Sequence, residues 1–165
     1  MYASALGIEI LCIMSAEIGQ SGSFFLFGYK DAFGITISYI LGYGLAGFTT
    51  FATILGRYNL EHVMDGCCSV LENESSGFVS NIKTTFKNFA MGIEKIPQVY
   101  KMANFRQIMK TSLYVLATGE SVCIITAETV NLVFFRHALW LSIPLSLFAG
   151  AFAITAIEAY RKVKS

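Results

Sequence analysis

Four long apolar stretches, separated by short polar interruptions, dominate the chain. Each exceeds the roughly 20 apolar residues that a helix needs to cross a bilayer. The stretches cover residues 2–28, 33–56, 111–135 and 138–160. Lys30 and Asp31 separate the first two stretches, and Arg136 and His137 separate the last two, which indicates two tight hairpins. The pattern predicts an all-α, multi-pass integral membrane protein in which residues 1–165 form a single membrane domain with four transmembrane helices.

The segment 57–110, between the second and third stretches, is polar overall but carries apolar residues at helical spacing. The apolar positions are Phe78, Ile82, Phe86, Phe89 and Ile93. Lys83 and Lys87 fall on another face of the same helix. The pattern is typical of amphipathic helices that lie on the membrane or pack beneath the spans, and both placements stay open. Pro97 is expected to break the second of these helices.

The basic residues predict an orientation. With four spans, both termini and the segment 57–110 lie on one side of the membrane, and the two short turns lie on the other. The side with the two turns carries only two basic residues, Lys30 and Arg136. The first side carries Arg57, Lys83, Lys87, Lys95, Lys101, Arg106, Lys110, Arg161, Lys162 and Lys164. Because Lys and Arg concentrate in cytoplasmic loops, we expect both termini and the amphipathic helices to be cytoplasmic.

Composition narrows the classes of function. Charged residues make up 14% of the chain, against about 25% in soluble domains. The net charge is +1, so the chain lacks the basic excess that nucleic-acid binding requires, and the expected surroundings are a lipid bilayer. No Ser-His-Asp set, Walker loop or dinucleotide glycine pattern is present. We therefore expect no catalytic activity of its own and no nucleotide or flavin cofactor.

An internal repeat relates the two hairpins. A shift of 111 residues pairs the first span with the third, and a shift of 104 residues pairs the second with the fourth more weakly. The first shift aligns Glu9 with Glu120, Cys12 with Cys123, Glu17 with Glu128, and Gln20 with Asn131. Glu, Cys and amide residues are rare in apolar helices, so their coincidence is informative. The repeat predicts two duplicated hairpins that run parallel, related by an axis along the membrane normal.

The repeated residues form a polar stripe that is unusual within a membrane. Carboxylates in hydrocarbon cost several kcal/mol, so they normally face the protein interior or water, with a proton or a cation nearby. Carboxylates together with the thiols of Cys12 and Cys123 favour a divalent transition metal. We expect Glu17 and Glu128 to carry the cation near mid-membrane, beside Gln20 and Asn131. Glu9 and Glu120, about 12 Å away along the axis, would line its cytoplasmic approach.

His62, Cys67 and Cys68 form a second group of metal-capable side chains just beyond the second span. Their spacing matches no standard zinc site. They are a candidate metal entry site, and the alternative is a solvated loop with buried thiols.

Short stretches resemble known transporters. Ala16-Glu17-Ile18-Gly19 resembles the Glu-x-Gly-Asp motif of the manganese/calcium–proton exchangers, with Gln20 in the place of the Asp. The same stretch is similar to the small multidrug transporters, whose first-span Glu binds cation and proton. A Glu- and Met-containing loop after the second span is similar in layout to the vacuolar iron transporters. These resemblances imply a cation- and proton-binding role for Glu17.

Two functions remain open from the sequence. The first is a membrane cation transporter that carries a divalent transition metal and couples its transport to protons through the intramembrane glutamates. Because four helices barely enclose a pathway, we expect this transporter to be a homo-oligomer. The second is an accessory subunit of a larger membrane complex, such as a membrane-bound oxidoreductase. There the same polar residues would only hold helices or partners together.

Overall fold

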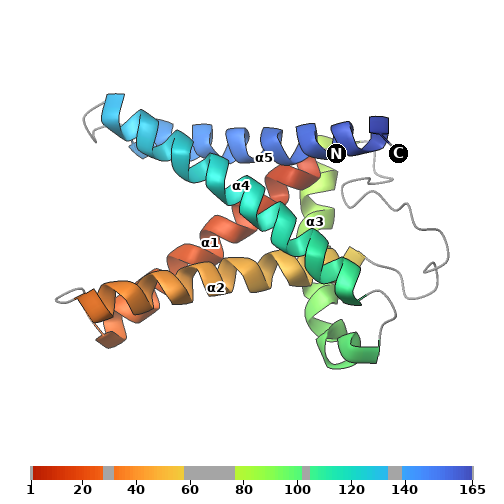
Figure 1. Ribbon diagram of the computed structural model, residues 1–165, viewed down its shortest axis with the longest axis horizontal. Coiled ribbons are helices and arrows are strands. Elements are labelled where there is room, and N and C mark those ends of the chain that lie inside the picture. The colour runs from red at the N-terminus through yellow and green to blue at the C-terminus, as the bar shows by residue number, and fades with distance from the viewer. Residues whose placement is uncertain (1, 28–31, 58–76, 102–104, 134–138, 165) are drawn as a thin grey trace.

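The structure is a computed structural model that describes residues 2–27, 32–57, 77–101, 105–133 and 139–164 (Figure 1). Its elements are α1 (Tyr2–Phe27), α2 (Ala32–Arg57), α3 (Phe78–Lys95), the 3-10 helix η1 (Ile96–Lys101), α4 (Phe105–Val133) and α5 (Leu139–Lys164). Helices α1, α2, α4 and α5 are each long and apolar enough to cross a membrane. For the described residues, the prediction of an all-α fold with four helices long and apolar enough to span a membrane is therefore confirmed.

The helix boundaries differ from the apolar stretches mainly at the polar ends. Helix α4 begins at Phe105, six residues before the apolar stretch, and α5 continues to Lys164, four residues beyond it. Hydropathy marks only the apolar part of a helix, whereas backbone hydrogen bonding continues into polar sequence. The two turns that contain Lys30 and Arg136 lie outside the described residues.

The four long helices pack as a bundle in which α1 contacts α2 and α5, and α4 contacts the same two helices. In the view of Figure 1, α1 and α4 run diagonally in opposite senses and their ribbons overlap in projection. The buried apolar core draws on all four helices. It consists of Ala5, Leu6, Ile8, Cys12, Ala46, Ile54, Leu55, Ile108, Val115, Ala151 and Ile154.

Small and hydroxyl side chains join α1 to α2. A Cβ atom at Gly19 would lie 2.9 Å from the carbonyl oxygen of Leu41, so the two backbones approach closely. Ser15 Oγ lies 2.6 Å from Thr49 Oγ1 in the same interface. Close approach through small residues, reinforced by interhelical hydrogen bonds, is a common way for membrane helices to associate.

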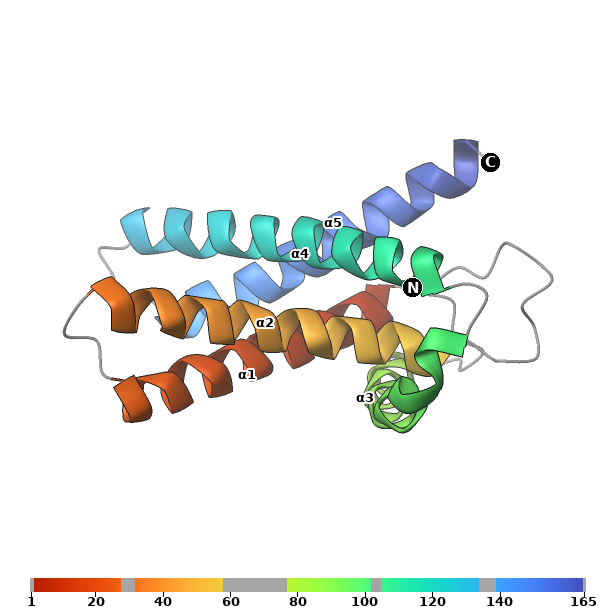
Figure 2. The same cartoon turned by 60° about the horizontal axis from the view of Figure 1, so that its bottom comes forward.

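Helix α3 lies across the α1–α2 pair at the end of the bundle where the chain termini lie (Figure 2). Its crossing with α2 brings Gly56 and Gly92 together so closely that a Cβ atom on either would overlap a backbone carbonyl of the other helix. Lys95 Nζ donates a hydrogen bond to the Gly56 carbonyl at 3.1 Å. The α-helix ends at Lys95, and Pro97 falls in η1, as expected for a residue that cannot donate a backbone hydrogen bond.

Candidate functional site

Glu9 is the most deeply buried carboxylic acid among the described residues, with 2% of its surface exposed. It lies on α1 in the stretch Ala3–Glu9, which is buried throughout. Burial of an ionisable side chain at this depth, in a helix long and apolar enough to span a membrane, is unfavourable without a specific reason. Glu9 is therefore the residue around which the site is built.

Two glycines make room for the Glu9 carboxyl group where α1 crosses α4 and α5. A Cβ atom at Gly119 would overlap Glu9 Oε1. A Cβ atom at Gly150 would lie only 3.0 Å from Glu9 Cδ. Helices α4 and α5 thus contribute backbone rather than side chains at this level, and the carboxyl group fills the space between them.

Cys123 is the hydrogen-bond partner of Glu9. Its Sγ lies 3.1 Å from Glu9 Oε2 and 3.0 Å from the carbonyl oxygen of Ser146 on α5. A thiol has one proton, so Cys123 donates to one of these two acceptors at a time. The sequence repeat pairs Cys123 with Cys12, whose Sγ lies 2.8 Å from Thr50 Oγ1 on α2. Both thiols are free and buried, and each ties its own hairpin together.

Glu120 completes the group. Its Oε1 is buried, and within the described part of the chain it has no hydrogen-bond partner. Glu120 lies close enough to Glu9, Cys12 and Cys123 to interact with each of them electrostatically. Four of the residues selected from the sequence repeat therefore lie together; we call Glu9, Glu120, Cys12 and Cys123 the Glu9 centre.

The remaining predicted residues lie elsewhere. Glu17 is exposed on the surface of α1, and Gln20 is half-buried against α2, where a Cβ atom at Gly42 would lie 2.8 Å from Gln20 Cγ. Glu128 and Asn131 belong to α4, but their side chains are outside the described part of the structure. His62, Cys67 and Cys68 also lie outside the described residues.

The described residues hold no group of three or more His, Cys, Asp or Glu side chains arranged to bind a metal ion. Three residues contact the Glu9 centre without having been predicted as part of a site. Gly119 and Thr50 were not selected from the sequence as site residues, and Gly150 was interpreted only as a packing residue. In the sequence, each of these positions is recognisable only as a small or hydroxyl residue in an apolar helix. Such a residue does not indicate which side chain of another helix will pack against it.

Comparison of the chain with protein-family models, with curated proteins and with solved structures finds no match. The features that bear on function are therefore the geometry of the Glu9 centre and its position within four helices that are long and apolar enough to span a membrane.

Proposed function

We propose that this chain is a membrane cation transporter with proton coupling, and that Glu9 and Glu120 form its ion-binding pair. The observation that carries the proposal is the carboxyl group of Glu9, enclosed between Gly119, Gly150 and Cys123 at the crossing of the spans. A carboxyl group needed only to hold helices together would be replaced at lower cost by an amide or a hydroxyl.

The charge balance of the Glu9 centre supports this proposal. Among the described residues, the hydrogen-bond partner of Glu9 is a thiol and not a cationic side chain. Two carboxylates that interact in an apolar interior require a compensating positive charge. A proton or a metal cation can supply that charge, and exchange of one for the other is the elementary step of proton-coupled transport.

The donor chemistry supports a divalent transition metal as the cargo. Carboxylate oxygens and thiol sulfurs together suit Mn²⁺, Fe²⁺ or Zn²⁺ better than Mg²⁺. Glu120 Oε1 is an acceptor without a partner in the described residues, so it is free to take a ligand. The side chains are not arranged around an ion as they stand. Binding of the metal would therefore draw Glu120 toward Glu9 and displace the proton.

Burial gives Glu9 the larger role. The sequence expectation assigned the central role to Glu17 and Glu128, but Glu17 is exposed on a single chain. Electrostatic interactions strengthen where water is excluded. We therefore place the tightest binding at Glu9 and Glu120, and Glu17 and Glu128 at a second level of the path.

Transport by reconstituted protein tests the proposal. Lipid vesicles that enclose a pH-sensitive dye would be given an inward Mn²⁺ gradient, and proton efflux would be recorded with and without protein. We expect Glu9→Gln to reduce the metal-driven proton flux at least about tenfold, because the amide cannot exchange a proton. The matched control is Glu94→Gln on the exposed surface of α3, which should leave the flux unchanged. Flux through correctly folded Glu9→Gln at the wild-type rate would refute the proposal.

One observation favours a second candidate, a subunit of a larger membrane complex. Glu17 is exposed on a membrane-spanning helix, where a lipid-facing carboxylate is costly. A partner protein, or a second copy of this chain, would remove it from lipid. Native purification distinguishes the two functions. Stoichiometric recovery with enzyme subunits supports the second candidate, whereas a homo-oligomer that binds Mn²⁺ in a Glu9-dependent manner supports the transporter.

A further inference from the structure

Helix α3 crosses α1 and α2 close to the ends of these two helices. A Cβ atom at Gly7 would lie 2.9 Å from Thr85 Cβ, and the contact with α2 is at Gly56. Gly7 is five residues from the start of α1 and Gly56 is one residue from the end of α2, which is at most about 8 Å of helix. Helix α3 crosses α1 and α2 within this last turn and a half (Figure 2).

The closest contacts of α3 with α1 and α2 are made by small and polar residues that lie beside its apolar face. The buried residues of α3 are Thr85 and Gly92, and Lys95 donates to the Gly56 carbonyl from the same side. Asn88 is half-buried beside Gly56. Ile82 is half-buried and packs against the apolar core. The helix therefore docks mainly through small and polar groups together with Ile82, and it leaves several large apolar side chains exposed.

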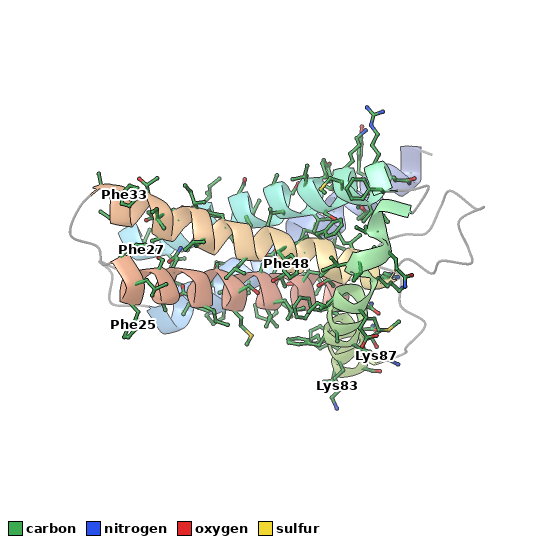
Figure 3. The ribbon with its side chains drawn as sticks, turned by 90° about the horizontal axis from the view of Figure 1, so that it is seen from below. Phe25, Phe27, Phe33, Phe48, Lys83 and Lys87 are labelled. Atoms are coloured by element: carbon green, nitrogen blue, oxygen red, sulfur yellow. The ribbon has the colours of Figure 1, made fainter. Side chains whose placement is uncertain are left out.

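Several large apolar side chains of α3 are exposed. Phe78 is 52% exposed, Phe86 37% and Ile93 43%. At 100° per residue these three fall within about 80° of one another on the helix. Lys83 and Lys87 occupy a neighbouring sector and point away from the spans (Figure 3). An apolar sector flanked by lysines is the pattern of a helix at a membrane surface.

We propose that α3 lies in the plane of the membrane, with Phe78, Phe86 and Ile93 among the lipid acyl chains and with Lys83 and Lys87 against anionic headgroups. The depth of α3 at the ends of the spans and its positive sector favour an anionic lipid surface. This placement does not depend on the function of the Glu9 centre.

Tryptophan quenching in vesicles tests where the apolar sector lies. In a Trp140→Phe background, which removes the chain's one tryptophan, Phe86→Trp would report from the apolar sector and Ser80→Trp from the exposed polar side of the same helix. We expect lipids brominated on the acyl chain to quench Phe86→Trp strongly, and aqueous acrylamide to quench Ser80→Trp strongly. Quenching of Phe86→Trp by acrylamide, or by neither reagent, would mean that water or protein covers this sector, and would overturn the proposal.

Headgroup selectivity tests the role of the lysines. Vesicles of equal parts phosphatidylserine and phosphatidylcholine would carry bromine on one lipid at a time. We expect brominated phosphatidylserine to quench Phe86→Trp about twofold more than brominated phosphatidylcholine. The ratio should fall to about one when Lys83→Gln and Lys87→Gln are added, and should be unchanged by Lys110→Gln on α4. Equal quenching by the two lipids in the protein with both lysines would refute the headgroup contact.

Discussion

The two ends of the bundle are packed very differently. At the end that carries the termini, α3 bridges α1 and α2, and nearly every residue of α1 up to Cys12 is buried. Toward the opposite end the α1–α2 and α4–α5 pairs diverge, and large apolar side chains are exposed (Figure 1). Phe25, Phe27 and Phe33 lie at this open end, and Phe25 is 89% exposed (Figure 3).

The difference places two glutamates of one helix in opposite environments. Glu9 lies in the closed half, enclosed by glycines, whereas Glu17, about two turns further along α1, is exposed in the open half. A single chain thus encloses a glutamate side chain only where its helices cross. Whether lipid or another protein surrounds the open half determines the role of Glu17.

The largest effect is expected at the closed end, in the α2–α3 crossing. Gly56→Ala would place a methyl group against the Asn88 carbonyl, and neither backbone can move without separating the helices. We expect the free energy of unfolding to fall by about 3 kcal/mol, measured by denaturant titration in detergent. Gly22→Ala, on α1 toward the open end, meets nothing within 4 Å and should gain up to about 1 kcal/mol. Equal effects of the two substitutions would mean that the two ends do not differ in packing.

The two glutamates supply the next test. Glu9→Leu removes the hydrogen bond from Cys123 and forces a branched side chain against Gly119 and Gly150, so we expect a loss of about 2 kcal/mol. Glu17→Leu should change the free energy of unfolding of the detergent-solubilised chain by less than about 0.5 kcal/mol. A comparable loss of unfolding free energy for Glu17→Leu would show that another protein surface buries Glu17 in the purified sample. The oligomeric state of that sample would show whether this surface is a second copy of the chain.

A smaller effect is expected where the steric neighbour is a side chain and not backbone. Gly119→Ala pushes the Glu9 carboxyl group aside and should cost about 1 to 2 kcal/mol. In a Glu9→Ala background the same methyl group enters the space left by the carboxyl group, although it still lies 2.9 Å from Ile154 Cδ1. A double-mutant cycle should therefore give a coupling of about 1 kcal/mol. Gly44→Ala, which meets nothing within 4 Å, should show no coupling with Glu9→Ala. Additive effects of Gly119→Ala and Glu9→Ala would show that Gly119 does not pack against the Glu9 carboxyl group.

Much of the fold could be predicted from the sequence, because the length and polarity of a span are local properties. Four apolar stretches of sufficient length gave four helices, and the periodic segment before Pro97 gave α3. Which side of α3 faces the spans could not be read from its periodicity. Docking proceeds through Thr85 and Gly92, because only a small residue permits the backbone contact with Gly56.

The sequence predicted four residues of the site, but it did not predict how the helices arrange them. Glu9, Cys12, Glu120 and Cys123 were selected from the repeat and lie together, yet no helical wheel shows which part of α1 other helices will cover. The repeat stays a prediction. Cys12 and Cys123 both reach a carbonyl on the next helix, those of Ala46 and Ser146. The 104-residue shift would instead pair Ser146 with Gly42, one turn away from Ala46. The sequence alignment of the second and fourth spans therefore differs by one helical turn from the correspondence that the thiol contacts give.

The smallest expected effect concerns Lys95, which donates to the Gly56 carbonyl at the closed end. Partial burial lowers the pKa of Lys95 from its usual value of 10.5, although the carbonyl at the end of α2 favours the ammonium form. Between the lowered pKa and 10.5 the unfolded chain then binds more protons than the folded one. The free energy of unfolding contributed by Lys95 therefore rises with pH through this window and levels off above it.

Thermal unfolding of wild type and Lys95→Gln from pH 8 to pH 11, compared as a difference, isolates this contribution because the other titrating groups cancel. We expect the stability of wild type relative to Lys95→Gln to increase with pH. Lys95→Arg keeps its charge throughout the range and should show no such rise relative to Lys95→Gln. A relative stability of wild type that decreased with pH would mean that the hydrogen bond to Gly56 outweighs burial. The charge of Lys95 would then stabilise the α2–α3 contact.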